Sequence, residues 1–271
     1  MAQEVIIKTM DQLITSGTKN YKISQRVIGF AGIDDRSRMH IDDVGDLILI
    51  THKDYKFILY YNPAADFLHQ PQDSLGIVFD ESSIKFALAD GVSIVQGILE
   101  NDSGELAKRL VIHMCQAKVD NKLGAIEKVV TQFKSDGYFG ASTLITGEIN
   151  GDKLKTLFIG SEDDIGDVRL FYNKQSLILA GARIGKVDFF NYKAHGFAGE
   201  DFRHDQGEQL LPNHFALVVA SDGAEISNTE LKKILKVAKE EFSLETLREA
   251  IKRAIKENPD DQSLLIIMKN R

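Results

Sequence analysis

The stretch Ile84-Lys-Phe-Ala-Leu-Ala-Asp90-Gly91 is an apolar, strand-like run that ends abruptly in Asp-Gly. The same arrangement returns at Phe215-Ala-Leu-Val-Val-Ala-Ser-Asp222-Gly223. Short apolar runs bounded by Gly, Asn, Asp or Lys are typical of β-strands. A single Asp-Gly after a strand is most often only a turn, but two strands that both end in Asp-Gly favour a shared role for the two aspartates.

Two further acidic sites lie next to predicted strands. Asp34-Asp35 precedes the first strong strand, and Asp260-Asp261-Gln262 comes just before the apolar run Leu264–Met268. If these strand ends converge, several carboxylates meet at one edge, and like charges that close repel one another unless a cation neutralises them. Because the ligands would all be oxygens, the pattern indicates a hard divalent ion, Mg²⁺ or Mn²⁺.

The remaining patterns predict an α+β fold. The expected strands are Asp46–Thr51, Lys56–Tyr60, Ile84–Ala89, Ser142–Ile149, Leu154–Ile159, Val168–Tyr172, Ser176–Ala180, Phe215–Ala220 and Leu264–Met268. The expected helices are Gly104–Val119, Leu123–Phe133, Thr229–Phe242 and Leu244–Ile255. Asn150-Gly151 predicts a tight hairpin between two of the strands. Strands that cluster instead of alternating with helices suit largely antiparallel sheets covered by helices.

Length and composition narrow the class of protein. The chain has 271 residues, 43% of them hydrophobic, and a formal charge of −7. With no internal repeat or linker, we expect a single domain over residues 1–271. The acidic balance excludes an evident nucleic-acid binder, no apolar run approaches the length of a membrane helix, and a lone Cys115 fits the cytoplasm.

Other chemistries find little support in the sequence. Cys115 lies within a helical pattern without the arginine that a phosphate-cradling cysteine nucleophile needs, so it is interpreted as a packed thiol. The stretch from Gly181 to Val187 only faintly resembles a phosphate-binding loop and is interpreted as a turn. The histidines show no spacing typical of metal ligands, which argues against zinc.

The ordered motifs resemble the PPM-type (type 2C) metal-dependent serine/threonine protein phosphatases. Phe86-Ala-Leu-Ala-Asp90-Gly91 is similar to that family's Phe-Ala-Val-x-Asp-Gly motif, and Gly104-Glu-Leu-Ala-Lys-Arg-Leu110 to the helix that follows it. The later matches, over a span from about Arg26 to Met268, are Gly140-Ala-Ser-Thr143, Ile165-Gly166-Asp167-Val168-Arg169, Ala220-Ser-Asp222-Gly223 and Asp260-Asp261-Gln262.

This resemblance implies an αββα sandwich that holds two Mn²⁺ or Mg²⁺ ions. The implied metal ligands are Asp35, Asp90, the Gly91 carbonyl, Asp222 and Asp261. The implied nucleophile is a water activated by the metals, so no protein nucleophile is expected. Asp167 is placed just behind the metals, with Asp163 and Asp164 as alternatives. The implied substrate is a phosphorylated protein or a small phosphoester.

The sequence departs from the family where substrate phosphate is usually bound. Phe30 stands at the position of a family arginine, and Arg26, Arg36 or Arg38 is the candidate replacement; of these we expect Arg36 and Arg38 to bind phosphate. Val92-Ser93 follows the Asp-Gly where Gly-Gly, led by Met or His, is common in the family. An active phosphatase is therefore the leading hypothesis, and a weak or inactive pseudophosphatase with a regulatory or binding role is the alternative.

Overall fold

A computed structural model of the chain describes residues 6–9, 26–31, 39–63, 72–80, 82–93, 95, 102–117, 121–160, 166–173, 175–180, 198–199, 204–240, 243–255 and 260–270. The chain divides into two compact units. Unit 1 comprises Met1–Asp34, Phe67–Ile165 and Phe190–Leu211, and unit 2 comprises Asp35–Asp66, Gly166–Phe189 and Pro212–Arg271. In the described residues, each unit contains one sheet and one pair of α-helices. Whether the chain behaves as one domain stays a prediction.

Unit 1 is built on a seven-stranded sheet, sheet A, in the order β1-β2-β6-β7-β8-β9-β12. Its strands are β1 (Ile6–Thr9), β2 (Arg26–Ala31), β6 (Ser74–Asp80), β7 (Ser83–Ala89), β8 (Leu144–Asn150), β9 (Lys153–Ile159) and β12 (His204–Leu210). Neighbouring strands are antiparallel except for the parallel pair β2 and β6. The turn predicted at Asn150-Gly151 joins β8 to β9, and Gly151 has a φ of 61°, which glycine adopts without strain.

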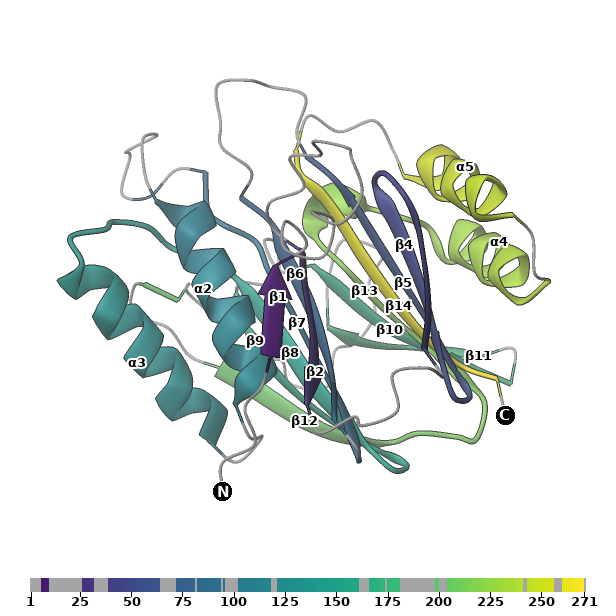
Figure 1. The fold of residues 1–271 in the computed structure, drawn as a ribbon, viewed down its shortest axis with the longest axis horizontal. Coiled ribbons are helices and arrows are strands. Elements are labelled where there is room, and N and C mark those ends of the chain that lie inside the picture. The colour runs from purple at the N-terminus through teal and green to yellow at the C-terminus, as the bar shows by residue number, and fades with distance from the viewer. Residues whose placement is uncertain are drawn as a thin grey trace. The chain divides into compact units, whose positions relative to one another are not determined.

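Helices α2 (Ser103–Gln116) and α3 (Lys122–Ser135) cover one face of sheet A (Figure 1). The predicted apolar stripe of α2 is buried and packs in one cluster with sheet and α3 side chains. Cys115 belongs to this cluster. Burial raises the pKa of its thiol to about 12, so the thiol stays protonated at neutral pH, as expected for a packed side chain.

Unit 2 is built on a second seven-stranded sheet, sheet B, in the order β11-β10-β13-β14-β5-β4-β3. Its strands are β3 (Met39–Val44), β4 (Leu47–His52), β5 (Tyr55–Asn62), β10 (Asp167–Tyr172), β11 (Gln175–Ala180), β13 (Phe215–Ala220) and β14 (Gln262–Lys269). All neighbours in sheet B are antiparallel. The all-apolar strand β13 is buried along its whole length, which fits its central place in the sheet.

Helices α4 (Asn228–Lys239) and α5 (Leu244–Ala254) cover one face of sheet B (Figure 1). Each begins at a serine cap: the Ser227 hydroxyl accepts from the Glu230 amide, and the Ser243 hydroxyl accepts from the Thr246 amide. Such caps satisfy amides that have no partner within the helix. The buried faces of both helices share one apolar cluster with β5, β13 and β14.

The fold class predicted from the sequence, α+β with two largely antiparallel sheets flanked by helices, is confirmed. Every predicted strand and helix coincides with an observed one, within a few residues at the ends. The sequence analysis missed β1, β2, β3, β6 and β12. Strand β12, His-Asp-Gln-Gly-Glu-Gln-Leu, lies at the edge of sheet A and needs no apolar pattern, because backbone pairing to β9 holds it.

Candidate metal site

Three of the predicted aspartates lie at the ends of neighbouring strands in sheet B. Asp167 is the first residue of β10, Asp222 follows β13 by two residues, and Asp261 directly precedes β14. Asp167 pairs in register with Ala220, and Ala220 pairs with Leu264. Because both strand pairs are antiparallel, the end of β13 meets the starts of β10 and β14. The three aspartates therefore lie at the same end of these three neighbouring strands.

The loop that carries Asp222 is bound tightly to the segment that carries Asp261. The Ser221 hydroxyl accepts from the Ser263 amide at 2.9 Å and donates to the Asp261 carbonyl at 3.4 Å. The Ser221 amide donates to the Ser263 carbonyl at 2.9 Å. A Cβ at Gly223 would overlap the Asp261 carbonyl oxygen, so only glycine allows the two segments to approach this closely. The backbone thus fixes Asp222 and Asp261 relative to each other.

Asp167 is held by a buried arginine. The Arg169 guanidinium, 1% exposed, forms an ion pair with the Asp167 carboxylate. The same guanidinium donates to the Ile226 carbonyl at 2.8 Å and to the Asn228 side-chain oxygen at 3.0 Å. Arg169 therefore links the start of β10 to the start of α4. Sequence reasoning noted Arg169 only as part of a motif and gave it no role.

Asp90 and Gly91 follow β7 in unit 1, where they pack against the start of α2 and the segment before β8. The Asp90 carbonyl accepts from the Thr143 amide at 2.8 Å and from the Ser142 hydroxyl at 2.9 Å. A Cβ at Gly91 would lie 2.8 Å from the backbone carbon of Ser103, at the start of α2. The Asp90 side chain is half-buried. Glycine is thus required where the strand end meets the helix.

The sequence analysis missed a second aspartate beside Asp90. Asp73 immediately precedes β6 and is 1% exposed. Ser74 pairs with Ala89, and the Gly91 amide donates to the Gln72 carbonyl at 3.2 Å, so the register continues and sets Asp73 opposite Asp90. Directly opposed residues share a face of the sheet. The sequence signal that could have revealed Asp73 is its place just ahead of the apolar run from Leu75 to Phe79, which resembles the acidic residues next to the other strands.

The remaining site predictions lie outside the described residues. They concern Asp35, Arg36, Arg38, Asp163 and Asp164. Within the described ranges, no group of three or more His, Cys, Asp or Glu side chains is arranged to hold a metal ion. The pair Asp222 and Asp261 does fit a hard divalent cation in chemistry, because its donors are carboxylate oxygens on a rigid support.

Solved structures similar to this chain include RsbX and several bacterial serine/threonine phosphatases. RsbX in complex with magnesium covers 85% of this chain and 98% of its own, with a TM-score of 0.54 and 14% identity. The S. agalactiae serine/threonine phosphatase covers 79% and 98%, with a TM-score of 0.56 and 18% identity. The Mycobacterium tuberculosis serine/threonine phosphatase PstP covers 80% and 99%, with a TM-score of 0.59 and 14% identity.

The chain has the PPM-phosphatase fold. No protein-family model and no curated protein matches the sequence. Sequence identities to similar solved structures are low, from 11% to 18%. The fold was therefore recognisable only from a few ordered motifs and from the structure. None of the described helices is long and apolar enough to cross a membrane.

Proposed function

We propose that the protein is a metal-dependent phosphatase that hydrolyses phosphoserine or phosphothreonine in proteins, or small phosphomonoesters. The observation that carries the proposal is the rigid joint in sheet B, where Ser221 and Gly223 fix Asp222 against the segment of Asp261. A fold shared with serine/threonine phosphatases supports it. We further propose a cytoplasmic location, with a phosphorylated protein or small phosphoester as partner.

The proposed site binds two Mn²⁺ or Mg²⁺ ions. The proposed ligands are Asp35, Asp90, the Gly91 carbonyl, Asp222 and Asp261. These ions supply an activated water and neutralise charge on the phosphoryl group. We propose Asp167, whose carboxylate is paired with the Arg169 guanidinium, as the residue just behind these ligands. Arg36 and Arg38 are the proposed phosphate-binding residues.

The direct test is hydrolysis of an aryl phosphate and of a phosphopeptide with Mn²⁺, with Mg²⁺ and with excess chelator. We expect turnover that requires the metal. We also expect Asp90→Asn and Asp222→Asn each to lower kcat at least a hundredfold, because each removes a carboxylate from the cations. Asp152→Asn is the matched control, since Asp152 lies in the exposed β8–β9 turn, where only its backbone carbonyl is used. Full activity in chelator, or equal loss in the control, would refute the proposal.

The alternative is a pseudophosphatase that binds metal without turnover. The presence of Phe30, where the family usually has an arginine, favours it. Calorimetry with Mn²⁺ separates the two hypotheses, because metal binding together with undetectable hydrolysis of both substrates would favour the pseudophosphatase.

A further inference from the structure

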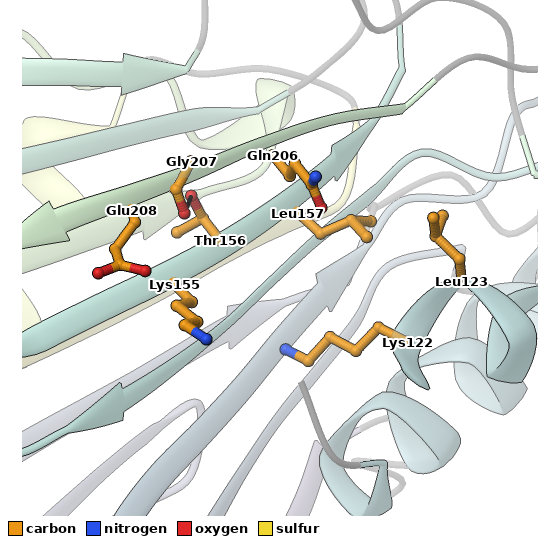
Figure 2. Close-up of a pocket in the computed structure, with 8 residues that line it drawn as sticks. All are labelled: Lys122, Leu123, Lys155, Thr156, Leu157, Gln206, Gly207 and Glu208. Atoms are coloured by element: carbon orange, nitrogen blue, oxygen red, sulfur yellow. Dashed lines mark hydrogen bonds between the residues drawn. The ribbon is translucent and has the colours of Figure 1, made fainter. Parts of the chain in front are cut away.

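A pocket of about 400 Å³ lies in unit 1, between the first turn of α3 and the strands β9 and β12 (Figure 2). Lys122 and Leu123 come from the helix, Lys155 and Leu157 from β9, and Gln206 and Glu208 from β12. Figure 2 shows the Lys122 and Lys155 ammonium groups pointing toward one another. The volume falls in the range of small-molecule sites and exceeds what a single phosphate ion fills.

Lys122 is a buried cation whose desolvation outweighs its compensation by the Thr146 hydroxyl and the nearby Glu148 carboxylate. Its side chain is 3% exposed, and its ammonium donates to the Thr146 hydroxyl at 2.9 Å. In the described part of the chain, no carboxylate lies within ion-pair distance of it. Burial lowers the pKa of Lys122 to about 8. A buried charge of this kind is stabilised when an opposite charge joins it.

Among the described residues around the pocket, lysines outnumber carboxylates, and Lys155 itself lies between Glu148 and Glu208 in sheet A. Lys85, Glu148, Lys155 and Glu208 form one row across sheet A in direct register. Glu148 lies between two lysines in that row, and Glu208 forms an ion pair with Lys153 at 3.4 Å. Cys115, from α2, also faces Lys122, and its thiol is protonated. The carboxylates near the pocket therefore already have cationic neighbours.

The start of α3 adds to the positive electrostatic potential in the pocket. This 14-residue helix begins at Lys122, its N-cap Asn121 makes no side-chain capping bond, and its first turn carries no acidic residue. The positive dipole end of such a helix favours an anion. The N-terminus of α3 and the two lysines thus all favour negative charge in this pocket.

We propose that this pocket binds a small phosphorylated molecule, with its anionic oxygens between Lys122 and Lys155. Leu123 and Leu157 would contact the rest of the ligand. On β7, the residue in register with Lys155 is Lys85. Lys85 precedes Asp90 by five residues, which corresponds to about 16 Å along a strand. The pocket is therefore separate from the proposed metal ligands of unit 1, and its occupancy does not depend on phosphatase activity.

The test uses the full chain without metal and in chelator, with pyrophosphate and citrate as probes. Titration followed by NMR should give saturable shifts at the amides of Leu123, Thr156 and Gly207. Lys122→Met and Lys155→Gln should each weaken binding at least tenfold, because each removes a charged donor. Lys134→Gln, at the exposed far end of α3, is the matched control and should bind as the unmodified protein does.

A second measurement follows citrate affinity with pH, because citrate keeps its charge at alkaline pH. Affinity should fall from pH 7 to pH 9 as Lys122 loses its proton, and this fall should be absent in Lys122→Met. Shifts that neither lysine variant weakens, or no saturable shift with either probe, would overturn the proposal. If Lys122→Met does not fold, the binding measured with Lys155→Gln tests the proposal, because the Lys155 side chain is exposed and its replacement should not disturb folding. Asp222→Asn should retain binding, which separates this site from the proposed phosphatase site.

Discussion

Lys122 lies in an environment that disfavours its charged form. A lysine that is 3% exposed carries a desolvation cost that one hydrogen bond to Thr146 does not offset, and its pKa falls from 10.5 to about 8. Since the folded-state pKa lies below the unfolded value, the cost is fully present below pH 8. It is relieved as pH rises from 8 to 10.5, where the folded protein releases the proton first.

Lys122→Met should therefore stabilise the protein at pH 7. The shift of Lys122 from 10.5 to about 8 corresponds to at most about 3 kcal/mol, and Thr146 keeps its bond to the Phe86 carbonyl. The gain should shrink toward pH 10.5. Urea unfolding at pH 7 and pH 10 measures both effects, with Lys134→Met as an exposed control expected within about 0.5 kcal/mol. A loss of stability at pH 7 would mean that the ammonium stabilises the fold.

At the scale of elements, strand ends in sheet B are fixed by a few polar contacts between segments. Arg169 joins the start of β10 to the start of α4 through Asp167, Ile226 and Asn228. A comparable link fixes α5, where Arg248 and Lys252 both bind Asp46 in the β3–β4 turn. Burial would raise the pKa of Asp46, but these two cations lower it overall, so the stability from this link is present above the ordinary carboxyl pKa and is lost as pH falls through the lowered one.

Arg169→Met should destabilise unit 2 by about 3–5 kcal/mol, because it breaks a buried ion pair and removes the hydrogen bonds to Ile226 and Asn228. The double variant Arg169→Met with Asp167→Asn should recover part of that loss, since no unpaired charge remains. Chemical denaturation of both variants and of Asp167→Asn gives the coupling between the two residues. Equal destabilisation in the single and double variants would show that packing of Arg169, and not its charge, matters.

At the scale of the whole molecule, each unit is assembled from separated parts of the chain. Strand β14 pairs with β5, so that Gln262 lies opposite Asn62, and the two side chains are hydrogen bonded at 3.1 Å. Such distant pairings must form before unit 2 is complete, which predicts slow folding. Neither unit is a continuous segment, so a simple truncation removes strands from a sheet.

Metal binding should stabilise the whole folded chain. A cation that binds only the folded state adds about 2.7 kcal/mol at a concentration of one hundred times its Kd. Calorimetric melting should therefore move upward with saturating Mn²⁺ and return to its starting value with chelator. Asp222→Asn should lose most of the shift and Asp152→Asn should keep it. An unchanged melting temperature with Mn²⁺ would count against the proposed metal site, whatever the activity.

The sequence by itself determined most of the strands and the four α-helices, because hydrophobic period and turn residues are local properties, although it did not reveal the buried strand β6. It predicted the strands that flank Asp90, Asp222 and Asp261, and it predicted all four described α-helices. It also determined the order of motifs that resembles a phosphatase family. It did not reveal the polar edge strand β12, whose place depends on backbone pairing to β9.

Only the tertiary structure decided which polar groups meet. The register between β6 and β7 sets Asp73 opposite Asp90, across more than a dozen residues of sequence. The tight approach of Gly223 to Asp261, the ion pair of Arg169 and the burial of Lys122 beside Lys155 likewise follow from strand pairing and helix packing. These contacts join residues far apart in the chain, and a residue's pKa, partners and exposure are set by its neighbours in space.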